Sequence, residues 1–375
     1  MELLHIDCLG RPLRLRGSLA GWQQLTWDGH VVSEHPASTT PVTHFTHAFS
    51  LQFKPPGAAP DDSEQPTQLL QVRLELDLQW QEFALGFQLF VNEKLISEGK
   101  RTTQEIESQV PSPSAPSAKS GGGAHTVGFV AIGLKLLQSA KFIKIALAGA
   151  TLAAYSWLLS FHFAVALIVC LVVHEYGHLR AMRYFGLRTK GIYLIPFFGG
   201  MALSDDKINT RWQDVVIAIM GPSFGLILSL VLWLVYSMTD HMFFAALANF
   251  NALLNLINLI PILPLDGGHI LKSICFSIDD RLGVIIVGIA TSLGIYTCFS
   301  LHLSFLAFVM LIGGIEIALE WRSRQFSQLL PLNRYGQVFS TIWYLLTLGF
   351  LVGIIWHFAN SGDPLLASPL RILQS

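Results

Sequence analysis

The stretch LVVHEYGHLRAM, residues 171–182, places two histidines and a glutamate inside an apolar run. An ionisable side chain at the centre of a membrane helix costs about 2.5–3.5 kcal/mol, so such residues need a partner. Residues four positions apart lie on one face of a helix, so His174 and His178 can direct both imidazoles at one point. Glu175 lies on the same turn. Two neutral imidazoles are suitable zinc ligands, and the spacing predicts a metal site with an adjacent general base.

The sequence around this stretch is typical of a membrane protein. Of its 375 residues, 52% are hydrophobic and only 13% are charged, whereas a soluble domain has about 25% charged residues. Apolar runs between residues 141 and 358 predict a polytopic α-helical membrane protein with about six to seven spans. Lys and Arg cluster before the first run, after the second and before the last, so the positive-inside rule places those segments in the cytoplasm. The tail, residues 359–375, would then lie outside.

Residues 1–108 have a different pattern and predict a small β-rich soluble domain. Runs such as QVRLELDLQW (71–80) alternate apolar and polar residues, as half-buried strands do. Asp28-Gly29 between two strand-like runs predicts a hairpin. No apolar leader with a cleavage site begins the sequence, so we expect this domain to be cytoplasmic.

Residues 109–140 are expected to be a linker and the approach to the membrane, because their Pro, Ser and Gly residues bury little apolar surface. The net charge is −1, and no basic stripe is interleaved with aromatic residues. Nucleic acid is therefore not an expected partner.

A catalytic zinc ion takes three protein ligands and keeps one position for water, so a third ligand is expected elsewhere in the chain. The best candidate is Asp266 in NLINLIPILPLDGGHILKS, residues 255–273, where two prolines and a Gly-Gly pair break the helix inside the apolar region. An alternative role for Asp266 is to cap the helix that follows. His269 is a rival ligand, or else a residue that hydrogen-bonds a ligand or lies at the membrane interface.

The segment HEYGH (174–178) in one apolar run and NLIPILPLDGG (258–268) in a later one together resemble the site-2 protease family of intramembrane zinc metalloproteases. The resemblance covers about residues 140–320. FFGGMA (197–202) and GPSFG (221–225) are also similar to glycine-containing segments that lie between the two motifs in this family.

This resemblance implies that one zinc ion per chain is bound by His174, His178 and Asp266. It implies that Glu175 activates the attacking water and that residues 141–358 form the metalloprotease domain. The expected reaction is hydrolysis of a peptide bond in or near a transmembrane segment of a membrane-anchored protein.

Three further residues are candidates for substrate binding. Asn258 is similar to a family asparagine just upstream of the Asp motif and could bind the substrate or the oxyanion, or instead another helix. Gly199 and Gly200 could let an extended substrate strand pair with the backbone of IYLIPFFGG, or could serve a re-entrant turn.

Two other functions are consistent with parts of the sequence. A catalytically silent membrane chaperone or adaptor would keep the protease fold, and Glu175→Gln distinguishes it from an enzyme. A di-iron membrane oxygenase needs many clustered histidines, whereas the other membrane histidines are scattered singly. The β-rich domain has no catalytic motif, so we expect it to bind a partner protein or the substrate, or to gate access.

Overall fold

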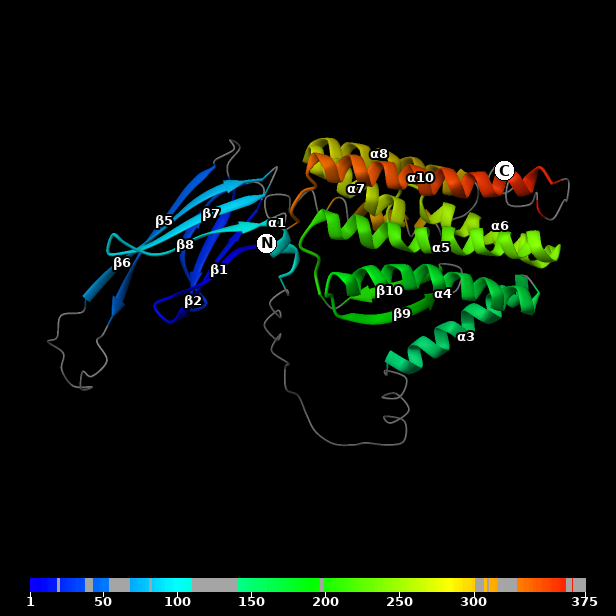
Figure 1. Ribbon diagram of the computed structural model, residues 1–375, viewed down its shortest axis with the longest axis horizontal. Helices are drawn as coiled ribbons and strands as arrows, with labels where there is room; N and C mark the ends of the chain where they lie inside the picture. The colour runs from blue at the N-terminus through cyan, green and yellow to red at the C-terminus, as the bar shows by residue number, and fades with distance from the viewer. Residues whose placement is uncertain are drawn as a thin grey trace, which may run out of the picture.

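In the computed structural model, a β region at the N-terminus is followed by a bundle of helices, and the two lie end to end (Figure 1). The sequence also predicts a mobile loop at residues 54–67 and a membrane span near residues 303–319. The loop, most of the linker and most of this span lie outside the described residues. The structure describes residues 1–18, 21–37, 43–53, 68–80, 83–109, 140–158, 160–195, 199–204, 206–300, 307–308, 310–315, 318, 329–361 and 366.

The β region contains two four-stranded antiparallel sheets in which consecutive strands pair. The first sheet is β1 (Glu2–Cys8), β2 (Arg11–Gly17), β3 (Gln23–Trp27) and β4 (His30–His35). The second is β5 (His44–Phe53), β6 (Gln68–Gln79), β7 (Ala84–Val91) and β8 (Lys94–Thr102). Their buried leucines form one core, because side chains alternate between the two faces of a strand.

The hairpin predicted at Asp28-Gly29 is present between β3 and β4. Both turn residues have positive φ, 48° for Asp28 and 83° for Gly29. Two successive residues of positive φ are the requirement of a type I′ turn, whose twist matches that of the flanking strands.

The helical region contains α3 (Ala140–Leu158), α4 (Phe161–Tyr184), α5 (Arg211–Thr239), α6 (Met242–Asn258), α7 (Asp266–Ile278), α8 (Asp280–Ser300) and α10 (Arg334–Ala359). Within the described residues, four helices are long and apolar enough to cross a membrane: α4, α5, α8 and α10. The prediction of membrane helices with a β-rich N-terminal region is thus confirmed, while the count of six to seven spans stays a prediction.

α5 is the central helix of the bundle, with α4, α6, α7 and α10 packed against it. Much of the buried core between these helices consists of alanine, including Ala218 on α5 and Ala245, Ala248 and Ala252 on α6. Small residues let helix backbones approach closely, which is how membrane helices gain packing contacts. The close approach brings polar side chains on α4, α6 and α7 within reach of one another.

The segment between α4 and α5 forms a β-hairpin. Its strands β9 (Thr189–Ile195) and β10 (Gly199–Ser204) pair antiparallel. The hairpin packs against α3 and α4, so it lies beside the helix that carries the HEYGH segment (Figure 1).

The β region contacts the bundle at the start of α5 through a short helix, α1 (Thr103–Glu107). The Asn209 side-chain amide donates to a carbonyl at the end of α1 at 3.2 Å. The Gln213 amide donates to the backbone carbonyl of Glu107, also at 3.2 Å. Leu330, from the segment before α10, packs in the core of the β region. The N-terminal end of α5 is therefore attached to the β region on one side and to the bundle on the other.

Candidate metal centre

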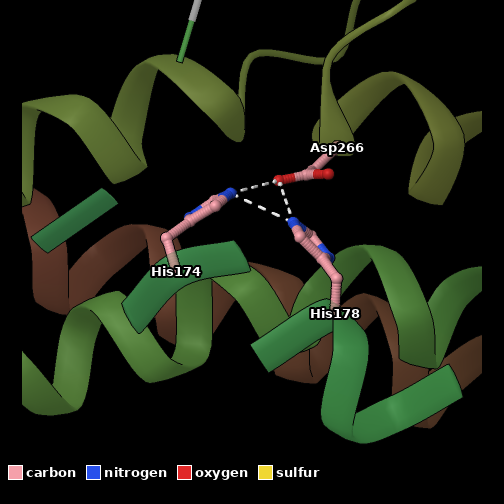
Figure 2. Close-up of side chains that lie close together, drawn as sticks. All are labelled: His174, His178 and Asp266. Carbon is pink, nitrogen blue, oxygen red and sulfur yellow. Dashed lines mark hydrogen bonds and ion pairs between the residues drawn. The ribbon is translucent and has the colours of Figure 1, made fainter. Parts of the chain in front are cut away.

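The structure brings His174 and His178 of α4 together with Asp266, the first residue of α7 (Figure 2). The Nε2 atoms of the two histidines are 3.0 Å apart. Asp266 Oδ2 lies 3.3 Å from the first and 3.4 Å from the second. In a tetrahedral zinc site with ligands about 2.0–2.1 Å from the metal, ligand atoms are about 3.4 Å apart. The three atoms are thus spaced as ligands of one ion would be.

Hydrogen bonds on the outer side of each imidazole fix which nitrogen carries the proton. His174 Nδ1 is 2.7 Å from the side-chain oxygen of Asn255. His178 Nδ1 is 2.6 Å from the backbone oxygen of Ile217. Both oxygens are acceptors when oriented this way, so each Nδ1 donates its proton and each neutral imidazole is left with a lone pair on Nε2.

With both imidazoles neutral, the inner side of the cluster presents two Nε2 lone pairs and one carboxylate oxygen to one another. The two Nε2 atoms face Asp266 Oδ2, which has no hydrogen-bond partner among the residues that the structure describes. A buried acceptor without a donor costs about 1–3 kcal/mol, and more when it is charged. A cation held by the three atoms would remove this cost, and two imidazoles with one carboxylate form a set that zinc accepts. The residues present therefore fit a zinc ion.

Asp266 does not act as a helix cap, so that alternative is wrong. The N-cap of α7 is Leu265, and no side chain accepts a capping hydrogen bond there. The two glycines that follow explain the close packing of this corner. A side chain at Gly267 would overlap the backbone of Leu259, and one at Gly268 would overlap the backbone of Ile262. The Gly-Gly pair thus lets α7 start against the chain leaving α6, with the Asp266 carboxylate directed at α4.

Glu175 is 3% exposed, and its Oε1 lies 3.9 Å from His174 Nε2. It is adjacent to the three-residue cluster without belonging to it. A Cβ at Gly200 would lie 2.6 Å from the same carboxylate oxygen, which shows that β10 passes directly over the Glu175 side chain. Gly199 starts this strand and pairs with Ile195. The predicted glycine pair is therefore in a strand next to the general-base candidate, not in a turn.

Asn255 is the residue of the site that the sequence did not indicate. Its amide donates to the backbone oxygen of Asn251 at 2.7 Å while its oxygen accepts from His174. Any side chain at Gly225 would overlap the Asn255 amide. Asn258, the predicted asparagine, donates to the Leu254 backbone oxygen at 3.3 Å instead. The glycine of GPSFG at 225 thus makes room for the amide that orients the first histidine.

Two other glycines explain why α4 and α5 approach closely enough for the Ile217 carbonyl to accept a hydrogen bond from His178. A side chain at Gly221 would overlap the His178 imidazole. A side chain at Gly177 would overlap the backbone oxygen of Met220. The glycines of HEYGH and GPSFG therefore face each other across the helix contact, and both are needed to place the second imidazole.

His269, the rival third ligand, faces a different residue. Its Nδ1 lies 3.6 Å from Asp214 Oδ1 on α5, and it is outside the cluster of three potential ligands. Asp214 also accepts a hydrogen bond of 2.6 Å from the Ser273 hydroxyl. His269 thus belongs to a second, partly buried polar cluster between α5 and α7.

The sequence pattern of Peptidase family M50 matches residues 162–241 and 237–301, which include all three residues of the metal cluster. Residues 162–301 belong to Peptidase family M50. This assignment confirms the resemblance to the site-2 protease family that the two motifs predicted.

Individual relatives match over the same part of the chain. A Synechocystis protein named as a candidate zinc metalloprotease is 37% identical over 137 residues, which are 35% of this chain and 36% of that protein. A zinc metalloprotease of Methanocaldococcus jannaschii is 35% identical over 115 residues, 29% of this chain and 33% of that protein. Stage IV sporulation protein FB of Bacillus subtilis is 27% identical over 171 residues, 43% of this chain and 59% of that protein. The chain thus spans only about a third to three-fifths of these relatives.

Proposed function

We propose that this chain is a zinc-dependent endopeptidase of the site-2 protease type, which hydrolyses a peptide bond in or near a transmembrane segment of a membrane-anchored protein. The observation that carries the proposal is the cluster of His174, His178 and Asp266, in which two imidazole nitrogens and a carboxylate oxygen converge at the spacing of ligands of one ion. Membership of the M50 family and the names of two relatives support zinc as the ion.

The roles of the residues follow from their positions. The two imidazoles and the Asp266 carboxylate would hold the ion, and Asn255 and the Ile217 carbonyl keep both imidazoles in the tautomer that can bind it. A bound zinc ion supplies Lewis-acid activation of water and of the scissile carbonyl. Glu175 is the group that takes a proton from the attacking water and later returns it to the leaving amine.

The placement of the site supports a substrate in the membrane. α4, which carries three of the four residues, is among the helices of the described residues that are long and apolar enough to cross a bilayer. A peptide bond in a helix is shielded by its own hydrogen bonds, so the substrate has to be extended locally. Gly199 and Gly200 lie in β10, with Gly200 against Glu175, and we assign them, with Asn258, to substrate contact. We also propose that the chain crosses the membrane six or seven times in total.

We further assign residues 1–108 to a cytoplasmic domain that binds a partner protein or the substrate. The contact of α1 with the start of α5 supports this assignment, because α5 is the helix on which the Ile217 carbonyl and Asp214 lie. A ligand bound to the β region would therefore be one helix away from the metal cluster.

Glu175→Gln tests the proposal. The variant protein, purified in detergent, should bind about one zinc per chain as the wild type does, because Glu175 is not a ligand. Cells carrying it should accumulate a full-length membrane-anchored protein that wild-type cells cut, as measured by proteomics of membrane fractions. A chaperone or adaptor would leave the same set of membrane proteins uncut in both strains, and that result would contradict the proposal.

A further inference from the structure

We propose that Asp214 is a positioning residue that sets the rotation of α7 and thereby brings Asp266 to the two histidines. The inference rests on the proposed zinc site and deepens it, because it assigns the orientation of the third ligand to a residue outside the M50 motifs quoted above. The carboxylate concerned lies on the first turn of α5 and is 14% exposed.

Asp214 uses both of its oxygens on α7. Oδ2 accepts a hydrogen bond of 2.6 Å from the Ser273 hydroxyl, and Oδ1 lies 3.6 Å from His269 Nδ1. His269 and Ser273 are three and seven positions after Asp266, so all three residues share one face of the helix. A carboxylate that holds two residues of that face also determines where the third one points.

At its metal end α7 packs through Gly267 and Gly268 against the chain leaving α6, and the Asp214 contacts lie one and two turns further along the helix. The helix begins at Asp266 itself, directly after the proline-containing break, and its N-cap makes no side-chain hydrogen bond. Side-chain atoms lie about 5–6 Å from a helix axis, so a rotation of about 20° would move Asp266 Oδ2 by about 2 Å. Zinc–ligand distances tolerate only about ±0.2 Å. A small loss of orientation is therefore enough to weaken a site that has only three protein ligands.

The surroundings of Asp214 are positively charged, which makes its replacement costly in a second way. Lys272 is 6% exposed and acts on the Asp214 carboxylate. Removing the carboxylate would also destabilise this cluster. A test must therefore separate the orientation of Asp266 from the general stability of the protein.

The experiment compares Asp214→Ala, Ser273→Ala and the control Ser223→Ala in the full-length protein. Ser223 is also on α5 and accepts a hydrogen bond from the Trp343 indole at 3.2 Å, but this bond joins α5 to α10 and not to α7. Zinc affinity is measured by competition with a chelator, and the melting temperature of the metal-free protein is measured alongside.

Asp214→Ala should bind zinc about 10- to 100-fold more weakly, as is usual when a residue that orients a ligand is lost. Ser273→Ala should show a smaller loss in the same direction, and Ser223→Ala should stay within about twofold of wild type. The double variant Asp214→Ala/Ser273→Ala should be no weaker than Asp214→Ala alone, because both changes break one contact. The visible spectrum of the cobalt-substituted protein should change in Asp214→Ala and not in Ser223→Ala.

A purely structural role predicts a different pattern, namely a lower melting temperature in Asp214→Ala with zinc affinity within about twofold of wild type. That pattern would overturn the inference. If Asp214→Ala does not fold, Ser273→Ala decides, and unchanged zinc affinity in that variant overturns the inference as well. Failure of the proposed zinc site itself is distinguishable, because the wild type would then bind no zinc.

Discussion

The buried histidines of the β region and of the helical bundle are partnered in opposite ways. His47 on β5 is 0% exposed. Its Nδ1 lies 2.9 Å from the Ser33 hydroxyl, and its Nε2 lies 2.9 Å from the side-chain oxygen of Gln23. One nitrogen accepts and the other donates, so the neutral ring is satisfied by protein alone. In His174 and His178 only the outer nitrogen has such a partner.

The difference teaches which observation identifies a metal site. Burial does not, since all three histidines are buried. The distinguishing observation is that two inner nitrogens and a carboxylate oxygen face one another as acceptors. His47 is also held neutral for a purely structural reason, because burial and, to a lesser extent, the neighbouring His35 lower its pKa to about 4.

The largest difference in zinc affinity is expected between His178→Ala in the bundle and His47→Gln in the β region. Loss of one of three ligands should reduce zinc affinity by about a thousandfold or more, because the buried Asp266 carboxylate then faces one imidazole only. His47→Gln should leave zinc affinity unchanged. Equilibrium dialysis followed by metal analysis measures both. Equal zinc loss in the two variants would mean that the β region contributes to the metal site.

A fall in pH should destabilise the β region through His47. The unfolded histidine has a pKa of 6.5 and folded His47 about 4, so the unfolded chain takes up the proton first as the pH falls. The free energy of unfolding of the β region should be fully present above about pH 6.5 and should decline between pH 6.5 and 4, by on the order of 3 kcal/mol.

Hydrogen–deuterium exchange of the β3 and β5 amides, corrected for intrinsic rates, measures this decline. His47→Gln is the matched control, since it removes the group that titrates. A wild-type protein whose β5 protection is flat from pH 7 to 4 would contradict the assignment of His47 as a structural neutral ring.

The next largest effect on zinc affinity is expected from Asn255, which hydrogen-bonds His174 on the side away from the metal cluster. Asn255→Ala removes the oxygen that fixes the His174 tautomer, and about a 10- to 100-fold loss of zinc affinity is expected. Asn258→Ala is the control on the same helix, because its amide bonds only to Leu254 among the described contacts. Chelator competition distinguishes them, and an equal or larger loss of zinc affinity in Asn258→Ala would contradict the role of Asn255.

The sequence predicted those parts of the site that depend on local geometry. The spacing of His174 and His178 is a property of any helix, and the break before Asp266 is visible from its prolines and glycines. The alternation in the N-terminal third similarly predicted strands and one hairpin. In each case the signal lies within about twenty consecutive residues.

The parts that the sequence did not predict depend on how helices rotate against each other. Asn251, Asn255 and Asn258 recur at helical spacing on α6, and nothing in that pattern says which amide faces α4. Asp214 has the appearance of an ordinary acidic residue in the first turn of a helix, where such residues are common. Only the packing of α5 against α7 gives it two partners.

The smallest effect is expected from Ser33→Ala, which should lower the stability of the β region only. Ser33→Ala removes the outer partner of His47 Nδ1, just as Asn255→Ala removes that of His174. Because no metal depends on His47, the loss should appear only as stability, about 1 kcal/mol in the β region. Exchange protection of β5 should therefore fall by about fivefold while zinc affinity stays at the wild-type value. Ser33→Ala and Asn255→Ala each remove one hydrogen-bond partner of a buried histidine. A change in zinc affinity in Ser33→Ala would therefore show that the β region and the metal cluster are coupled through α1 and α5.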